Sequence, residues 1–168
     1  LPALADTSVS VPGTSNPWLA GMPEGTEASF GDQAPTHSPV ELSLYGMSGA
    51  LSFSASGSVR NGPCCAWRDP DGGEFFTHYV GAEHGISDIN APINALVGVF
   101  LADWSQVGEP VTEALDFASI GLDFGYLAPQ IGQVFFIGDG MTADGLVQQF
   151  GIPVGATRLF LGTMDGYT

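Results

Sequence analysis

Basic residues are almost absent from this chain. It has no lysine, and its three arginines stand against eighteen aspartates and glutamates in 168 residues, for a formal net charge of −15. A protein that binds nucleic acid needs a basic surface to neutralise phosphates. We therefore predict no nucleic-acid partner. The excess of carboxylates indicates cation binding, an acidic surface suited to a salty or extracellular setting, or both.

Long apolar runs and common catalytic motifs are also missing. No stretch of about 18 consecutive apolar residues occurs, so we expect no membrane span. The sequence contains no G-x-S-x-G, H-E-x-x-H, G-x-G-x-x-G or P-loop pattern. No spacing singles out a nucleophile or a pair of catalytic carboxylates among so many candidates. We therefore predict that the protein is not an enzyme.

Cysteine is scarce as well, and the only two, Cys64 and Cys65, are adjacent. A disulfide between neighbours strains the intervening peptide. Free thiols, a disulfide to another chain or a vicinal disulfide, and metal binding all remain open, and the pair alone is a weak metal signal.

Turn-forming residues, in contrast, are abundant, with 24 glycines and 12 prolines. They separate short runs rich in Val, Leu and Phe, a pattern typical of strands. The clearest run is Leu51–Val59, where Leu51, Phe53, Ala55 and Val59 alternate with serines, as in a half-buried antiparallel strand. The other predicted strands are Thr7–Val11, Val40–Tyr45, Phe75–Val80, Ala95–Trp104, Val134–Ile137, Leu146–Phe150 and Thr157–Leu161.

Eight or nine short strands without a long amphipathic helix predict an all-β fold, an antiparallel β-sandwich or jelly roll. We expect Trp18 and Trp104 to pack in the interior, and a turn of helix within Val111–Phe117. No linker divides the chain. We predict an N-terminal extension at residues 1–10, as a signal remnant or a donor strand, and one sandwich domain at residues 11–168.

Carboxylates in Gly-rich turns form the first candidate metal site. Asp139 and Asp144 follow one apolar run, and Asp165 follows another. Calcium takes six to eight oxygen ligands from flexible loops, so we predict these three aspartates as calcium ligands, with Thr142 beside them. The alternative is that Asp-Gly pairs simply favour turns. Two weaker candidate groups are Asp69, Asp71, Glu74 and His78, and Glu83, His84, Asp88 and Asn90.

Trp67 is the best candidate for stacking on a sugar, because it lies in a polar loop with Arg68 and Asp69. The alternative is that this tryptophan pins its own loop to the body of the protein.

Five segments together resemble the LecA-like galactose-binding lectins and related domains of secreted bacterial proteins with a C-terminal sorting tail. They are Val11–Thr26, Leu51–Val59, Ile89–Leu101, Gln133–Gly140 and Ile152–Tyr167. The resemblance implies a secreted, galactose-binding-like β-sandwich that binds carbohydrate. It also implies a calcium ion held by Asp165 and by an Asn pair that would fall beyond Thr168, with sugar hydroxyls completing the coordination. We accordingly predict Trp67, Asp165 and Tyr167 as ligand-binding residues.

The same resemblance places the last strand of the sandwich beyond Thr168, which would leave a neighbouring strand edge open. Either the natural chain continues, or a strand from another copy covers the edge and builds polymers. The extended segment Leu1–Val11 is the expected donor. The alternative function is therefore a structural subunit of an extracellular filament or surface assembly. Ala3–Leu4–Ala5 fits the small-residue pattern of a signal cleavage site and favours export.

Overall fold

The computed structural model describes residues 6–165 and shows an almost wholly β protein, which confirms the predicted fold class. Two 3₁₀ turns, η1 (Pro17–Leu19) and η2 (Ser29–Gly31), and one short helix, α1 (Phe117–Ile120), accompany the strands. The strands of the described part are β1 (Val40–Ser43), β2 (Ala50–Leu51), β3 (Phe75–Thr77), β4 (Ile89–Pro92), β5 (Leu96–Leu101), β6 (Leu115–Asp116), β7 (Tyr126–Leu127), β8 (Val134–Phe136), β9 (Gln149–Gly151) and β10 (Arg158–Thr163).

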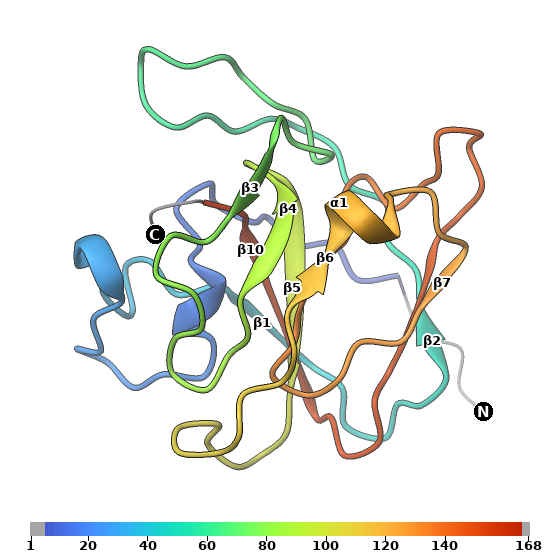
Figure 1. The fold of residues 1–168 in the computed structure, drawn as a ribbon. Helices are drawn as coiled ribbons and strands as arrows, with labels where there is room; N and C mark the ends of the chain where they lie inside the picture. The colour runs from blue at the N-terminus through green and yellow to red at the C-terminus, as the bar shows by residue number, and fades with distance from the viewer. Residues whose placement is uncertain (1–5, 166–168) are drawn as a thin grey trace.

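The strands form one four-stranded sheet in the order β1-β10-β5-β8 and two three-stranded sheets, β2-β9-β7 and β3-β4-β6. Strands β5 and β10 run side by side through the middle of the molecule (Figure 1), with Leu101 opposite Arg158 and Leu96 opposite Thr163. Most strand pairs are antiparallel, as predicted, but β4 pairs with β6, and β7 with β9, in parallel. The arrangement agrees with a sandwich, and the jelly roll stays a prediction.

Aromatic side chains fill the space between the four-stranded sheet and the segments packed on it. The rings of Phe100 and Phe135 stack with centroids 5.0 Å apart. Phe135 also contacts Phe150 of β9 at 5.6 Å, and Phe136 contacts Phe117 of α1 at 5.7 Å. Each of these rings is at most 2% exposed. Offset or tilted aromatic pairs of this kind add stability beyond the area they bury.

The N-terminal segment is held against the end of β10. Thr163 donates its backbone N–H to Ser15 O and its hydroxyl to Gly13 O, both at 2.9 Å. The approach is close enough that a Cβ on Gly162 would lie 2.7 Å from Ser15 O. Glycine at this position therefore lets residues 13–16 lie beside the last described strand.

Three predicted strands differ from the structure. Of Leu146–Phe150 only Gln149 and Phe150 lie in a strand, β9, and Leu146 and Val147 are exposed. Thr7–Val11 belongs to none of the described strands, and its residues 7–10 are exposed. In Leu51–Val59 the apolar positions are half-buried and the serines exposed, as predicted, yet only Leu51 lies in a strand. The alternation of apolar and polar residues correctly predicted which side chains face inward. It did not predict whether another strand lies beside this segment to form the hydrogen bonds of a sheet.

Trp18 is fully buried, as predicted, whereas Trp104 is 55% exposed, so its placement in the core was wrong. β5 ends at Leu101, and the chain leaves the sheet before reaching Trp104. The predicted turn of helix was also misplaced, because Asp116 caps α1 and the helix begins at Phe117, where the predicted range ends. No helix in residues 6–165 is long and apolar enough to cross a membrane.

Candidate functional site

A shallow polar depression of about 170 Å³ lies at the Thr163 end of β10. Four separate parts of the chain line it: residues 13–16, the pair Asp32 and His37, the pair Arg60 and Asn61, and the pair Thr163 and Asp165. It is smaller than the roughly 300–1,000 Å³ of pockets for drug-sized ligands, so it suits a small polar group. We refer to it as the polar depression.

Asp32 is fixed on one wall of the polar depression by two neighbours. Asn16 donates from Nδ2 to one carboxylate oxygen at 3.1 Å, and His37 Nε2 lies 3.5 Å from the other. Because the backbone N–H of Gln33 donates to His37 Nδ1 at 3.2 Å, the ring hydrogen lies on Nε2 and faces the carboxylate. The arrangement holds an acceptor-rich group at the surface.

Arg60, another lining residue, takes part in the only Arg–Trp stack among residues 6–165. The guanidinium of Arg60 lies 4.6 Å from the ring centroid of Trp67. The antiparallel bridge between Val59 and Arg68 makes Arg60 and Trp67 the next facing pair, which explains the contact. Trp67 is 60% exposed, so the predicted accessibility is confirmed. Arg60 covers part of its ring and joins it to the polar depression.

The three aspartates predicted to bind calcium do not come together. Asp139 donates its N–H to Asp71 Oδ1 and accepts from the N–H of Met141, both at 2.8 Å. Asp144 is exposed beyond this turn, and Asp165 lies in the polar depression. Thr142 accepts the N–H of Leu146 at 3.1 Å. The first two aspartates thus serve the turn chemistry that the sequence analysis gave as the alternative. Tyr167 lies outside the described residues, as does Ala3–Leu4–Ala5.

The two weaker groups of acids and histidines are also dispersed. Glu74 pairs with Arg68 at 3.0 Å, and Asn90 donates to Asp116 at 2.8 Å. No set of three or more His, Cys, Asp and Glu side chains in residues 6–165 could hold a metal ion. The structure instead joins His78 of one group to Glu83 of the other.

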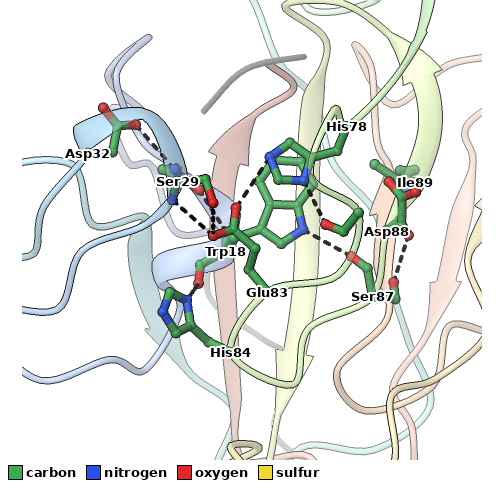
Figure 2. Close-up of polar contacts among 11 residues, drawn as sticks. Trp18, Ser29, Asp32, His78, Glu83, His84, Ser87, Asp88 and Ile89 are labelled. Carbon is green, nitrogen blue, oxygen red and sulfur yellow. Dashed lines mark hydrogen bonds and ion pairs between the residues drawn. The ribbon is translucent and has the colours of Figure 1, made fainter.

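This junction is a buried network beneath the η2 turn (Figure 2). The His78 ring stacks on the indole of Trp18, with centroids 3.6 Å apart and planes 13° apart. Trp18 Nε1 donates to Ser87 O at 3.0 Å, and the Trp18 carbonyl contacts His84 Nδ1 at 2.9 Å. One carboxylate oxygen of Glu83 accepts both the N–H and the hydroxyl of Ser29 at 2.9 Å. We call these residues the Trp18–His78 network.

The other Glu83 oxygen faces His78 Nε2 at 3.5 Å, and the two side chains are 10% and 0% exposed. His78 Nδ1 lies 2.7 Å from Gly81 O, a pure acceptor, so Nδ1 carries a hydrogen. Both of these facing atoms are buried, and neither makes a hydrogen bond within the described residues. The network thus holds the loop after β3 against the η2 turn through the two hydrogen bonds from Ser29 to Glu83 and the close approach of Glu83 to His78.

The chemistry available at the polar depression is recognition by hydrogen bonds. Asp32 and Asp165 offer acceptors, and Arg60 and Asn61 offer donors. Calcium requires six to eight oxygens, and two carboxylates with neighbouring amides do not make such a set from the described residues alone. Cys64 and Cys65 are free and exposed, with sulfurs 3.0 Å apart; the hydrogen bond between the two thiols and the loss of hydration raise the pKa of Cys65.

Sequence reasoning missed most of the polar depression. It identified Asp165 and the nearby Trp67, but not Asn16, Asp32 or Arg60. Asn16 did carry a signal, because Asn before Pro17 is a typical helix start, and its Oδ1 accepts the N–H of Trp18 at 2.9 Å. Asp32 and Arg60 carried none beyond their places in turns.

Comparison with models of protein families, with curated proteins and with solved structures found no match.

Proposed function

We propose that this protein is a non-catalytic carbohydrate-binding module, and that the polar depression binds a neutral sugar. One observation carries the proposal: Asp165, Arg60 and the Arg60–Trp67 stack meet at one small polar surface, although they are distant in sequence. A sugar presents hydroxyls that both donate and accept, which suits mixed acceptors and donors around a shallow depression. It also presents an apolar C–H face, which suits an exposed indole.

The charge of the chain favours neutral over acidic sugars. With a net charge of −15, the surface repels anionic ligands at long range. Asp32 and Asp165 add two local acceptors that would repel a carboxylated or sulfated sugar but accept hydroxyls. We place this binding outside the cell, as the sequence resemblance implies.

The test is calorimetric titration with galactose, glucose, mannose and N-acetylglucosamine. Asp165→Asn removes a charged acceptor, and Trp67→Ala removes the ring. A hydrogen bond to a charged group contributes about 1.5–3 kcal/mol, so Asp165→Asn should weaken binding by about 10- to 100-fold. Trp104→Ala is the matched control, because Trp104 is similarly exposed but follows the Leu101 end of β5, away from Thr163.

Unchanged affinity in both Asp165→Asn and Trp67→Ala, with native thermal midpoints, would refute this site. Binding of none of the four sugars by the wild-type protein would refute the proposal for these hexoses.

Calcium is a separate proposal, motivated by the sequence resemblance at Asp165. A ligand at 100 times its dissociation constant adds about 2.7 kcal/mol of stability, which for this size raises the thermal midpoint by about 5–10 °C. A midpoint that is the same with chelator and with added calcium would exclude a calcium site of that affinity.

Self-assembly is the second candidate function, and one observation favours it. Residues 7–10, which carry a strand-like alternation around Val9, are exposed and lie in no described strand. β1 meanwhile forms an edge of the four-stranded sheet. Residues 1–11 of one copy could add to such an edge in another. Polymers in electron micrographs that disappear when residues 1–11 are deleted would support this function, and a monomer at all concentrations would exclude it.

A further inference from the structure

The tip of the loop between β2 and β3 carries two exposed thiols side by side. Cys64 and Cys65 are the only cysteines of the chain, and both are free. Their sulfur atoms are 3.0 Å apart, and the loop extends away from the sheets (Figure 1). A disulfide bond is about 2.0 Å long, so the two sulfurs are within about 1 Å of bonding distance. We call Cys64 and Cys65 the thiol pair.

A turn brings these two sulfurs to the same side of the chain. In an extended chain, neighbouring side chains point to opposite sides, which would separate the sulfurs. Here the N–H of Cys65 donates to Gly62 O at 3.3 Å and closes a turn, and Gly62 has a φ of 83°. Glycine adopts this left-handed conformation readily, and Pro63 restricts the next φ to a value that suits a turn. The Gly-Pro sequence before the thiol pair therefore favours the conformation in which the sulfurs meet.

The base of this loop is held by contacts between its two arms. Val59 and Arg68 exchange backbone hydrogen bonds of 2.9 and 2.8 Å, and Arg60 stacks on Trp67 at the next position. Beyond these contacts, residues 62–66 are all exposed. Small solutes therefore reach both sulfurs, while the ends of the tip are held in place.

The surroundings of the thiol pair are basic, in contrast to the chain as a whole. Residues 59–68 contain two of the three arginines and no aspartate or glutamate. The hydrogen bond with Cys64 and the loss of hydration raise the pKa of Cys65, and the charge of Arg60 opposes that rise. Because the thiolate is the reactive form, Arg60 favours reaction at this pair. Its charge also attracts reagents that carry carboxylates, which the acidic surface elsewhere would repel.

We propose that the thiol pair is a reversible redox site, which a small carboxylate-bearing disulfide oxidises to a ring-closed disulfide between Cys64 and Cys65. One cysteine thiolate attacks a sulfur of the small disulfide, forms a mixed disulfide and expels one small thiolate. The thiolate of the other cysteine then attacks the protein sulfur of that mixed disulfide and expels the second small thiolate. The protein loses two electrons and two protons, and these convert the small disulfide into two thiols. Strained or exposed disulfides are readily reduced, so added thiols should reverse the reaction. The site does not require sugar binding.

The experiment incubates the reduced protein with excess glutathione disulfide and follows its intact mass and free thiols. We expect the wild type to lose both thiols together, with a mass lower by two hydrogens and no retained glutathione. Cys64→Ser and Cys65→Ser lack the second thiol, so each should retain one glutathione as a stable mixed disulfide. Dithiothreitol should restore both thiols of the wild type. Accumulated mixed disulfides in the wild type, disulfide-linked dimers, or retention of both thiols would overturn the proposal.

The same reaction in concentrated urea measures what the fold contributes. The unfolded chain must form the turn from Gly62 to Cys65, whereas the native chain already has it. Ring closure, measured in buffers with varied ratios of glutathione to its disulfide, should therefore be about ten-fold more favourable in the native protein. Equal equilibrium constants in the two states would show that the fold does not orient the thiols, and the inference of a built site would fail.

Gly62→Ala tests the turn without removing a thiol. The added Cβ would meet no atom within 4 Å, so its effect is confined to the backbone, where the φ of 83° is unfavourable for alanine. The variant should lose most of the native advantage and keep the constant measured in urea within about two-fold. An unchanged native constant would refute the role of this turn.

Discussion

Removing the carboxylate of Glu83 should destabilise the protein more than removing an exposed acid such as Glu109. Glu83→Ala deletes the carboxylate that accepts two hydrogen bonds from Ser29 and faces buried His78 Nε2. Each hydrogen bond to a charged group contributes about 1.5–3 kcal/mol, so the loss of both should lower the free energy of unfolding by about 3–6 kcal/mol. For a chain of this size that corresponds to a fall in thermal midpoint of about 6–24 °C.

A double-mutant cycle separates the hydrogen bond from the rest of this cost. Ser29→Ala removes only the hydroxyl donor to Glu83 and should cost about 1.5–3 kcal/mol, the value of a bond to a charged group. In the Glu83→Ala background the hydroxyl has lost its acceptor, so the double variant should be more stable than additivity predicts by about the same amount. Glu83→Gln, which keeps an amide oxygen for Ser29, should fall between wild type and Glu83→Ala.

Urea unfolding monitored by tryptophan fluorescence measures these free energies, provided that the dependence on denaturant is unchanged among variants. Glu109→Ala is the control, because this exposed loop acid should change stability by less than about 0.5 kcal/mol. The reasoning fails if Glu83→Ala is as stable as the control, or if the cycle is additive within about 0.5 kcal/mol.

Two further predictions concern stability alone. Gly98→Ala would place a Cβ 2.7 Å from the Phe135 ring and 3.0 Å from Ile137 Cδ1, so we expect overpacking to cost about 1–3 kcal/mol in urea unfolding; wild-type stability would show that the core yields easily. Burial raises the pKa of Asp71 against the hydrogen bond from Asp139, so the ionised form opposes folding and this cost appears as pH rises through the carboxyl range near pH 4. Asp71→Asn keeps an acceptor for that N–H and should raise the melting temperature at pH 7, with the gain disappearing at pH 3; an equal gain at both pH values would refute the charge explanation.

Local sequence patterns predicted where most strands lie. Contacts between segments far apart in the sequence determined which of these segments pair in a sheet. Val134–Phe136 and Arg158–Thr163 formed close to where the apolar runs placed them, because buried runs between glycines have few other solutions. Leu51–Val59 has an equally clear strand-like pattern, yet most of it lies in no strand. Its alternation determined burial but said nothing about which backbone would lie opposite.

The polar depression could be predicted only in fragments for the same reason. Asp165 was identified from its place after a strand, and Trp67 from its polar loop. Their meeting depends on the hydrogen bond from Thr163 to Ser15, which joins segments far apart in sequence, and on the local stack of Arg60 on Trp67. The proximity of His78 and Glu83 could not be predicted for the same reason, because the conformation of the loop between them, and not their spacing in the sequence, brings them together.

Asn16 connects the polar depression to the buried network with a single side chain. Its Oδ1 caps the N–H of Trp18, and its Nδ2 holds Asp32 on the wall of the depression. Trp18 in turn supports His78, and through Glu83 the same network supports Ser29. The side chain that holds the wall of the depression therefore also belongs to the buried contacts that hold the η2 turn.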